Sequence, residues 1–332
     1  MTGQNGGTDL RGKSVLVTGG LGFIGSNVVR RCLDLGAKVT VYDCLDPRSG
    51  GNLYNLQDIE DSVEVVVNDL RNFEGLSTHV RRKHVVFNCA AYTSHPQSMK
   101  EPLIDIDVNC KGVINLLEAA RRFNPEVKVV HVGTSTQIGR MVKGEVDELH
   151  PEFPVDIYSA NKAASEKYVL VYSGAYGMHT CVIRLANVFG PRSNIRSPDF
   201  GFMNFFIGLA LQGKEIQVFG DGAQIRTVTY IDDCVDALIR AATHPASDGE
   251  VFFATSDRRY SVKEIAESIV RQIGGTLRFV PWPKERAAIE IGDAVIVSRK
   301  IRDRLGWKAQ TDLAGGLAPT ADYFKPCLQK YL

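Results

Sequence analysis

The sequence lacks three features that would each have fixed its class: net charge, paired cysteines and long hydrophobic runs. Lys and Arg number 39 against 38 Asp and Glu, so the formal net charge is +1. No long-range field therefore draws the chain to nucleic acid or to a membrane surface. Its 7 cysteines show no CxxC or Cys/His ligand spacing, which argues against a disulfide framework and against a metal site.

Long apolar segments are also absent. No run approaches the ~18 apolar residues that a membrane span needs, and the segment MTGQNGGTDLRGK has no apolar signal core. These absences predict a cytoplasmic protein whose partners include no nucleic acid and no membrane. What is present is a globular composition of 44% hydrophobic and 23% charged residues over 332 positions, which predicts about two domains at ~150 residues each.

The first half of the chain alternates short β-branched runs with helical stretches. Near-continuous apolar strands that alternate with helices are typical of a parallel sheet covered on both faces. We therefore predict an α/β fold, a Rossmann-like doubly wound parallel sheet followed by a smaller mixed α/β C-terminal domain that takes the substrate. The strands are expected at 14–18, 38–43, 63–67, 84–88, 127–132 and 180–185, and the helices at 103–123, 158–176, 202–212 and 262–273.

The boundaries follow from composition. Residues 1–12 are polar and Gly-rich, which predicts a flexible tail, and residues 13–189 carry the alternating pattern. From about residue 190 the composition changes to loops rich in Pro, Gly and Arg. We assign residues 190–226 and 258–332 to the second domain and expect 227–257 to return to the first.

The segment VTGGLGFIG at 17–25 follows the first predicted strand and opens a helix. Gly19, Gly22 and Gly25 permit a tight turn and a close approach of backbone, with Phe23 and Ile24 beginning the helix. Unpaired N–H groups and the helix dipole at such an N-terminus favour a pyrophosphate. This pattern predicts a dinucleotide site.

An acidic residue selects the dinucleotide. The second predicted strand ends in Asp43, about twenty residues further on, where a carboxylate can accept hydrogen bonds from both adenosine-ribose hydroxyls and would repel a 2′-phosphate. We therefore predict NAD rather than NADP as the cofactor, and residues 13–189 as the NAD-binding domain. Arg48 downstream could serve either form.

Tyr158 and Lys162, in YSANK, are the first candidates for catalysis. At positions i and i+4 they share one helix face, so the Lys ammonium is expected beneath the phenol, where it would lower the phenol pKa. Thr134 ends the strand predicted before them, at the sheet edge where ligands bind in α/β proteins. Its hydroxyl is expected to share a proton with the substrate oxygen that Tyr158 titrates.

Together these residues resemble the extended short-chain dehydrogenase/reductase family, and within it the nucleotide-sugar epimerases and dehydratases of the UDP-glucose 4-epimerase type. The resemblance runs over nearly the whole chain, with its motifs in family order. They are TGGLGFIG, Asp69-Leu70, NCAA at 88–91, Asn109 before a Leu-rich helix, the Thr134 segment, Tyr158/Lys162, RLANVFGPR at 184–192 and GDGAQIRTVTYIDD at 220–233.

The resemblance implies further roles. On the cofactor side, Asp69 and Leu70 would border the adenine, Ala90 and Ala91 would flank the cofactor's backbone, and Asn109 would contribute to the same site. On the substrate side, it implies a nucleotide-diphospho-sugar bound by Ser135, Thr136, Asn187, Arg226 and Arg286, the last three near the diphosphate. Residues 190–226 and 258–332 would then form the sugar-nucleotide-binding domain.

The residues after Thr134 favour one reaction. Relatives that eliminate water carry Asp then Glu at these two positions, and decarboxylases carry Glu at the second, whereas this chain has Ser135 and Thr136. Without a carboxylate to act on a leaving group, oxidation and re-reduction at one carbon is the simpler chemistry. We predict epimerisation of a UDP-sugar at C4 through a transient keto sugar.

Two other functions stay open at this level. A 4,6-dehydratase or decarboxylase would draw its acid from elsewhere, with Asp199, Glu145 and Asp147 as the candidates. An NAD-binding regulatory protein without catalysis is the second alternative, against which the intact Tyr158/Lys162 pair argues. His95, in the segment YTSHPQSMKEP, would meet a sugar hydroxyl or carboxylate, or is structural.

The family also implies a homodimer, built from the helices at 103–123 and 158–176 of two subunits. Both helices are apolar on more than one side, which fits either a subunit interface or burial within one chain.

Overall fold

The computed structural model describes residues 8–288 and 290–332. Seven parallel strands form the main sheet in the order β11-β6-β5-β4-β1-β2-β3, which confirms the predicted doubly wound fold. The strands are β1 (Ser14–Thr18), β2 (Lys38–Asp43), β3 (Val63–Val67), β4 (Val85–Asn88), β5 (Lys128–Thr134), β6 (Thr180–Leu185) and β11 (Val251–Ala254). Most residues are buried in every strand except the edge strand β3, whose residues are partly or fully exposed, so the sheet is covered on both faces over most of its width.

The order of the strands sets the place of the ligand site. From β1 the chain moves outward through β2 and β3, then returns to the other side of β1 as β4 and continues through β5 and β6. Successive connections therefore run in opposite directions on the two sides of the β1–β4 pair. The two strands pair in parallel, with Val15 opposite Val85 and Thr18 opposite Asn88. A crevice opens at such a switch point outside the carboxyl ends of the strands.

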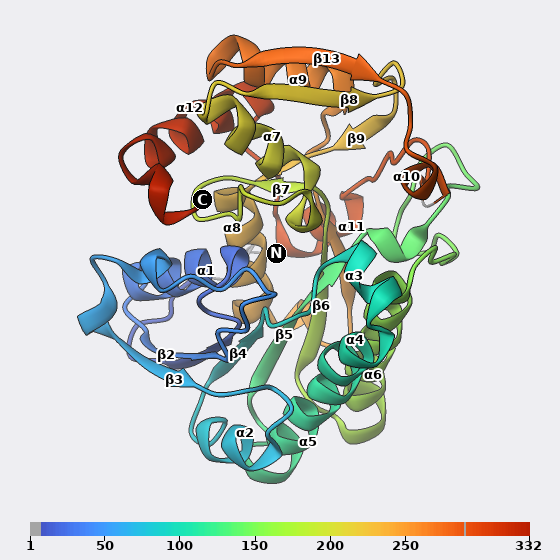
Figure 1. Cartoon of the computed structure of the whole chain (residues 1–332). Helices are drawn as coiled ribbons and strands as arrows, with labels where there is room; N and C mark the ends of the chain where they lie inside the picture. Colours follow the sequence, from blue (N-terminus) through green and yellow to red (C-terminus); the bar gives the residue numbers. More distant parts are fainter. Residues whose placement is uncertain (1–7, 289) are drawn as a thin grey trace.

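Helices cover the two faces of the sheet (Figure 1). On one face lie α1 (Phe23–Asp34) and α8 (Ile231–Thr243), and on the other α2 (Phe73–His79), α5 (Val113–Phe123) and α6 (Ile157–Tyr176). The helix predicted at 103–123 is present in three joined parts, because α4 (Pro102–Ile106) continues through a π-helical turn (Asp107–Gly112) into α5. Before it, α3 (His95–Lys100) packs against α6.

The remaining elements form a second, smaller lobe, drawn at the top of Figure 1. It contains the parallel pair β8 (Glu215–Phe219) and β13 (Thr276–Val280) and the antiparallel pair β9 (Ile225–Thr227) and β12 (Arg259–Ser261). Around them lie α7 (Phe202–Leu211), α9 (Val262–Gln272), α10 (Lys284–Ala288) and α12 (Leu313–Phe324), and the short pair β7 (Val188–Phe189) and β10 (Thr229–Tyr230) links the lobes. Helix α11 (Arg299–Leu305) packs instead against β11 of the main sheet.

The chain returns from the second lobe to the sheet through α8 and β11, and β11 pairs with β6. This path is consistent with the proposed return of residues 227–257 to the first domain. The predicted flexible tail of residues 1–12 lies partly outside the described residues. Within them Leu10 is 2% exposed and the Gly12 N–H donates to the Gly36 carbonyl at 3.0 Å.

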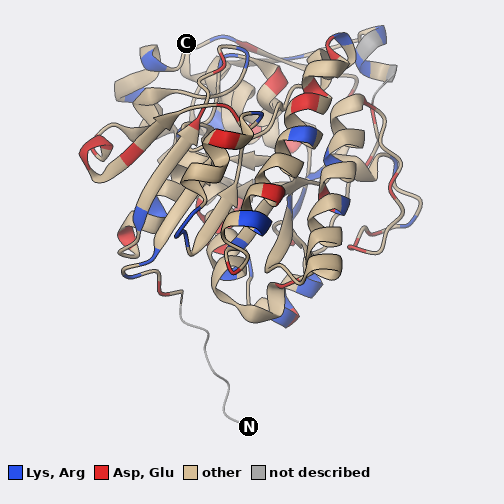
Figure 2. Ribbon diagram, turned by 90° about the horizontal axis from the view of Figure 1, so that it is seen from below, with Lys and Arg blue, Asp and Glu red and all other residues tan. Residues whose placement is uncertain are grey.

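Basic and acidic residues are interspersed over the face seen in Figure 2. This distribution follows from the nearly equal numbers of the two charges. Over the described range, the structure contains no helix that is both long and apolar enough to cross a membrane.

Candidate active site

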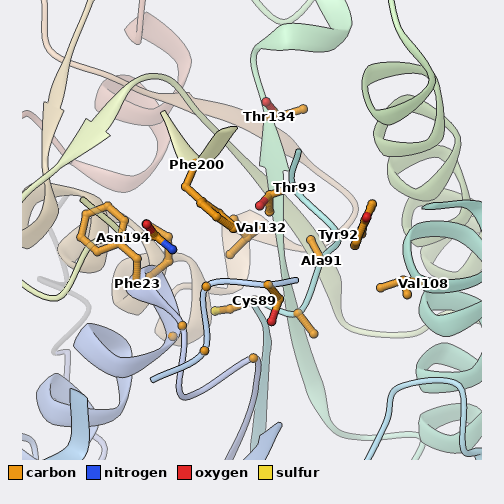
Figure 3. A pocket seen from close by; sticks show the side chains of 18 of the residues that line it. Phe23, Cys89, Ala91, Tyr92, Thr93, Val108, Val132, Thr134, Asn194 and Phe200 are labelled. Carbon is orange, nitrogen blue, oxygen red and sulfur yellow. The ribbon is translucent and has the colours of Figure 1, made fainter. Parts of the chain in front are cut away.

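A cleft of about 460 Å³ lies at the carboxyl edge of the sheet, closed on one side by the second lobe. In the view of Figure 3, Phe200 lies between Phe23 and Asn194 on one side and Val132 and Thr93 on the other. Most of the predicted site residues line this cleft: Gly19, Gly22, Phe23, Ile24, Gly25, Asp43, Asp69, Leu70, Ala90, Ala91, Thr134, Thr136, Tyr158, Lys162 and Asn187. Asn109, Ser135, Arg226 and Arg286 are not part of its lining.

The glycines of the first turn are required by close packing. Gly19 has a φ of +66°, and a Cβ on it would lie 2.7 Å from the Ala90 nitrogen. A Cβ on Gly25 would lie 2.1 Å from the Gly19 carbonyl oxygen. Helix α1 then begins at Phe23, and its N-cap residue, Gly22, has no side chain to accept a hydrogen bond from the first turn. The first N–H groups of α1 and the positive end of its dipole therefore face the cleft. These features fit the pyrophosphate of a dinucleotide.

Asp43 ends β2 and is 7% exposed. Its Oδ2 accepts a hydrogen bond from the Leu21 N–H at 3.0 Å and its Oδ1 accepts one from the Leu45 N–H at 2.9 Å. Burial raises the pKa of this carboxyl, and the two backbone hydrogen bonds oppose the rise. Each carboxylate oxygen keeps a second lone pair, so the group fits the ribose hydroxyls expected of NAD.

The neighbouring charges are paired among themselves. Arg48 binds Asp46 through two hydrogen bonds of 3.0 and 2.8 Å, and Arg71 binds Asp69 at 2.9 and 2.6 Å. Arg48 therefore points its guanidinium at a carboxylate of its own loop. This arrangement leaves Asp43 as the buried acid at the end of β2.

Asn109 has a different place from the one that the resemblance implied. It is buried in the π-helical turn, where its Oδ1 accepts from the Tyr92 N–H at 3.1 Å and its Nδ2 donates to the Tyr92 carbonyl at 2.8 Å. The side chain thus fixes both polar groups of one residue in the loop after β4. Because that loop carries Ala90 and Ala91, Asn109 shapes the cleft from behind its wall.

Tyr158 is the second residue of α6 and is 8% exposed. Burial raises its pKa well above the ordinary value, and a hydrogen bond with Thr134 opposes the rise. Lys162 is buried too, and burial lowers its pKa to about 8. The predicted effect of Lys162 on the phenol pKa stays a prediction; in the protein alone the Lys162 Nζ donates to the Val132 carbonyl at 2.7 Å.

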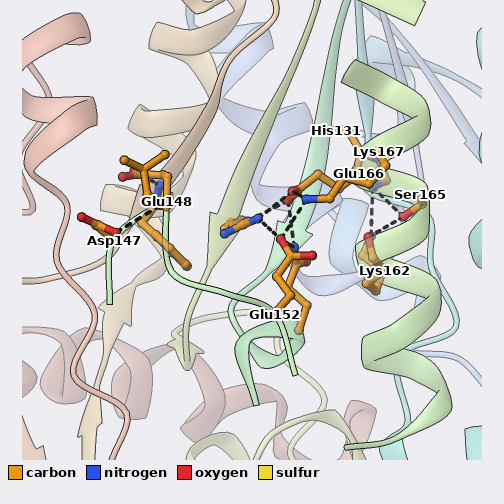
Figure 4. A network of polar contacts seen from close by, with 12 residues as sticks. His131, Asp147, Glu148, Glu152, Lys162, Ser165, Glu166 and Lys167 are labelled. Atoms are coloured by element: carbon orange, nitrogen blue, oxygen red, sulfur yellow. Dashed lines mark hydrogen bonds and ion pairs between the residues drawn. The ribbon is translucent and has the colours of Figure 1, made fainter. Parts of the chain in front are cut away.

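The ammonium of Lys162 has a second neighbour inside the protein (Figure 4). Its Nζ lies 3.2 Å from Nε2 of His131, whose Nδ1 lies 2.9 Å from the Asn88 amide. His131 is completely buried, and burial together with the charge of Lys162 lowers its pKa well below the ordinary value. The contact with this buried, neutral imidazole therefore helps to fix the direction of the Lys162 side chain.

A chain of hydroxyls runs from Thr134 into α6. The Oγ1 atoms of Thr134 and Thr136 lie 3.1 Å apart, and the Ser159 Oγ donates to Thr136 at 3.0 Å. Ser135 lies outside the cleft lining, and its N–H donates to the Leu185 carbonyl at 2.9 Å. The segment 134–136 thus offers hydroxyl groups to the cleft and no carboxylate.

The buried carboxylates behind this segment belong to an ion-pair network. Arg184 binds Glu166 at 2.7 and 2.6 Å and Glu152 at 2.5 Å. Gln137 donates to both carboxylates at 3.1 Å, and Lys167 binds both as well, as Figure 4 shows in part. These acids are neutralised by cations and lie outside the cleft lining.

The substrate side matches the predictions less well. Asn187 lines the cleft and donates to the Thr227 carbonyl at 2.8 Å. Arg226, outside the lining, binds Glu290 at 2.7 Å and the Gly292 carbonyl at 2.6 Å. Arg286 lies 3.8 Å from Asp199. Their partners come from segments that dock from far away in the sequence, which local patterns do not reveal.

The structure also shows where the three acids lie that were considered as the general acid of a dehydratase. Asp199 lines the cleft, in a 3₁₀ turn of the second lobe (Pro198–Phe200). Glu145 is bound by Arg259 and Arg299 and lies outside the lining, as does Asp147.

Sequence reasoning missed part of the site. Thr93, Asn194, Phe200 and Phe202 line the cleft, and no motif marked them. It also left open the role of His95, which lines the cleft and whose Nδ1 lies 2.7 Å from Oδ2 of Asp156. The two are 61 residues apart, so no local spacing signals the pair.

The fold and the cleft define a dinucleotide-binding α/β protein with a Tyr/Lys pair at its ligand site. The chain belongs to the NAD dependent epimerase/dehydratase family, whose model matches residues 15–254. This confirms the resemblance and assigns NAD as the cofactor. The residues at the cleft fit that cofactor, through the glycine turn, the open N-terminus of α1 and Asp43.

Relatives include enzymes of two activities. A UDP-glucose 4-epimerase of Mycolicibacterium smegmatis is 32% identical over 93% of this chain and 98% of its own length. A dTDP-glucose 4,6-dehydratase of the same organism is 26% identical over 94% and 93%. The solved UDP-glucose 4-epimerase of Thermotoga maritima with UDP-glucose is 29% identical, with a TM-score of 0.85 over 95% of this chain and 99% of that one. The chain is thus of an enzyme family that contains both reactions.

Proposed function

We propose that this protein epimerises a nucleotide-diphospho-sugar, a UDP-sugar inverted at C4, by transient oxidation to a keto sugar and re-reduction on the opposite face. The observation that carries the proposal is the set of hydroxyl groups at the cleft. Tyr158 and Thr134 meet there, and the two residues after Thr134 are Ser135 and Thr136 rather than acids. Such a site can move one proton to and from one oxygen without assisting a leaving group.

The chain's own residues divide the work. NAD supplies the hydride acceptor and donor when bound. Tyr158 takes the proton from the sugar hydroxyl and later returns it, and Thr134 holds the same oxygen by a hydrogen bond. Burial raises the pKa of Tyr158 and lowers that of Lys162 to about 8, so burial favours the neutral form of both groups and a phenolate at Tyr158 needs a positive charge beside it. Lys162, held by His131 and the Val132 carbonyl, supplies the positive charge that favours the phenolate.

The second lobe is proposed to bind the sugar nucleotide. Asn187 lies in the cleft lining and is the proposed contact for the diphosphate. Arg226 and Arg286 stand behind it, one bound to Glu290 and the other near Asp199. To bind a diphosphate, each arginine has to release its carboxylate partner. The diphosphate carries more negative charge than a single carboxylate and is the proposed competitor for the guanidinium.

A dehydratase is the runner-up, because relatives of that activity match nearly the whole chain and because Asp199 lies in the cleft lining. Asp199, however, comes from the second lobe rather than from the Thr134 segment. A decarboxylase has the same difficulty. A regulatory NAD-binding protein is disfavoured by the Tyr158 and Lys162 pair in the cleft.

The test is a panel of UDP-, dTDP-, GDP- and CDP-sugars, each incubated with the purified protein and NAD. Product stereochemistry is determined by NMR and product mass by mass spectrometry. We expect conversion of a UDP-sugar to its C4 epimer with unchanged mass and no accumulation of NADH. Loss of 18 or 44 mass units would establish dehydration or decarboxylation instead.

A homodimer remains part of the proposal. Helices α4 and α6 pack against each other and expose large apolar side chains, Leu103 and Ile106 on α4 and Val171 and Tyr176 on α6. A second copy that presents the same two helices would bury these side chains about a two-fold axis. We expect light scattering to give twice the 36.5 kDa chain mass, and Leu103→Glu to reduce it to the monomer. A wild-type monomer at micromolar concentration would refute the dimer.

A further inference from the structure

The proposed C4 reaction leaves one polar pair in the cleft without a role. His95, the first residue of α3, lines the cleft, and its Nδ1 lies 2.7 Å from Oδ2 of Asp156, the N-cap of α6. The side chain of His95 is 30% exposed and that of Asp156 only 3%. The imidazole therefore reaches the cleft while the carboxylate stays behind it.

The carboxylate is built into the fold. Its Oδ1 accepts the Ser159 N–H at 2.8 Å and so caps α6. Although burial raises the pKa of Asp156, the hydrogen bonds from His95 and Ser159 outweigh it and hold the pKa below its ordinary value. An ionised Asp156 accepts a hydrogen bond from the Nδ1–H of His95, which leaves the lone pair on Nε2. This is the carboxylate-imidazole arrangement of a general base with an orienting group.

The pair lies next to the proposed catalytic tyrosine. The rings of His95 and Tyr158 meet edge to face, with centroids 4.8 Å apart and an interplanar angle of 75°. A second contact fixes the two helices, since the Ser98 Oγ of α3 accepts the Tyr158 N–H at 3.0 Å. A substrate whose oxygen is held by Tyr158 therefore brings the neighbouring atoms of its ring toward His95.

Oxidation at one carbon changes the chemistry of the next. A carbonyl makes the C–H bonds on the adjacent carbons acidic, because the electron pair left by the proton spreads onto the carbonyl oxygen. That oxygen is the one that Tyr158 and Thr134 hold in the proposed reaction. A base beside Tyr158 meets such a C–H bond only after the sugar has been oxidised.

We propose that His95, oriented by Asp156, is a second acid/base of this site and exchanges the hydrogen on the carbon next to the oxidised one. The proposal rests on the proposed oxidation by NAD. In the step, Nε2 takes the proton from the carbon, the C–H electron pair becomes the C=C bond of an enolate, and the carbonyl oxygen takes the negative charge. Return of a proton from Nε2 restores the ketone, on the original face or the opposite one. No further oxidant or reductant takes part.

The consequence is a wider activity than inversion at C4. A keto sugar that is reprotonated on the opposite face is inverted at the neighbouring carbon as well. The substrate class is then a hexose nucleotide with a hydrogen on the carbon beside C4, and the product has the mass of the substrate.

The experiment is turnover in D₂O with UDP-glucose and with each sugar nucleotide that the panel shows to be converted. Wild type is expected to incorporate solvent deuterium at a carbon adjacent to C4, seen as one added mass unit and as loss of that proton's NMR signal. His95→Gln is expected to lower the exchange by at least tenfold, since general acid-base assistance contributes ~10²–10⁴-fold.

Two variants separate chemistry from folding. Asp156→Asn keeps a side-chain oxygen for the N-cap of α6 but removes the charge, and it should lower the exchange while circular dichroism and NAD binding stay as in wild type. His179→Gln is the matched control, because His179 pairs with Asp248 at 2.6 Å and neither residue lines the cleft. Its exchange rate should equal that of wild type.

The outcomes distinguish the two proposals. Conversion of a sugar at C4 without solvent deuterium at either neighbouring carbon overturns the role of His95 and leaves the C4 reaction intact. The same holds if His95→Gln and Asp156→Asn raise KM and leave the exchange rate unchanged, which would make the pair a binding group. If no sugar nucleotide of the panel is oxidised, the proposed function fails, and the role of His95 fails with it.

Discussion

The two sides of the cleft differ in how far apart in the sequence their parts lie. On the cofactor side, a strand, a glycine turn and the start of a helix follow one another between Ser14 and Gly25, and all three expected glycines line the cleft. On the substrate side, Arg226 contacts Glu290 and Gly292, and Arg286 lies near Asp199. A motif within one short segment therefore predicts which side chains line the cleft. For a side chain whose partners come from distant segments, the sequence predicts only the part of the molecule in which it lies.

The largest expected effect is at Tyr158. Tyr158→Phe should lower kcat by ~10²–10⁴-fold, because the ring still packs while the titratable oxygen is lost. NAD binding, followed by titration, should stay near that of wild type, since the glycine turn and Asp43 are untouched. A variant that keeps more than about a tenth of the wild-type rate would remove Tyr158 from the mechanism.

A smaller effect is expected on the cofactor side at Asp43. Asp43→Ser should weaken NAD binding by at least about tenfold, the lower end of the loss expected for one hydrogen bond to a charged group. Relative binding of NADP should improve, because the 2′-phosphate no longer meets a carboxylate. Equal affinity of the unmodified protein for NAD and NADP, measured by calorimetry, would show that Asp43 does not select the cofactor.

The smallest effect tests the substrate side. Arg226→Ala should raise KM for the sugar nucleotide by about tenfold or less and leave kcat nearly unchanged. The arginine is already bound to Glu290, so its contribution to substrate binding is only the difference between its interaction with the diphosphate and its interaction with Glu290. Glu290→Gln is the companion variant and should lower KM by releasing the guanidinium. A fall in kcat without a change in KM for Arg226→Ala would contradict a role as an anchor.

Much of the fold was predictable because each element carries its own signal. The strands at 14–18, 38–43, 63–67 and 180–185 have the predicted bounds, since β-branched runs between turns define them locally. The π-helical turn at Asp107–Gly112 was not predicted, and the hydrogen bonds of its Asn109 go to Tyr92, 17 residues earlier, where no local pattern signals them.

Prediction of the site from the sequence was limited in the same way, by contacts between distant segments. Tyr158, Lys162 and Thr134 line the cleft as expected, whereas the expected effect of Lys162 on the Tyr158 pKa stays a prediction. That effect depends on where an ammonium with four rotatable bonds points, and here the Val132 carbonyl and His131 decide it. The pairing of His95 with Asp156 was equally invisible, since it joins α3 to the start of α6.

The central claim is that one carbon of a sugar nucleotide is oxidised and then reduced by the same hydride. The direct test is a UDP-sugar deuterated at C4, converted by the protein with NAD and examined by NMR and mass spectrometry. We expect an epimerised product that keeps the deuterium at C4, with no label in water and no NADH released. Loss of the C4 deuterium to solvent, or NADH that accumulates in proportion to the substrate consumed, would contradict it.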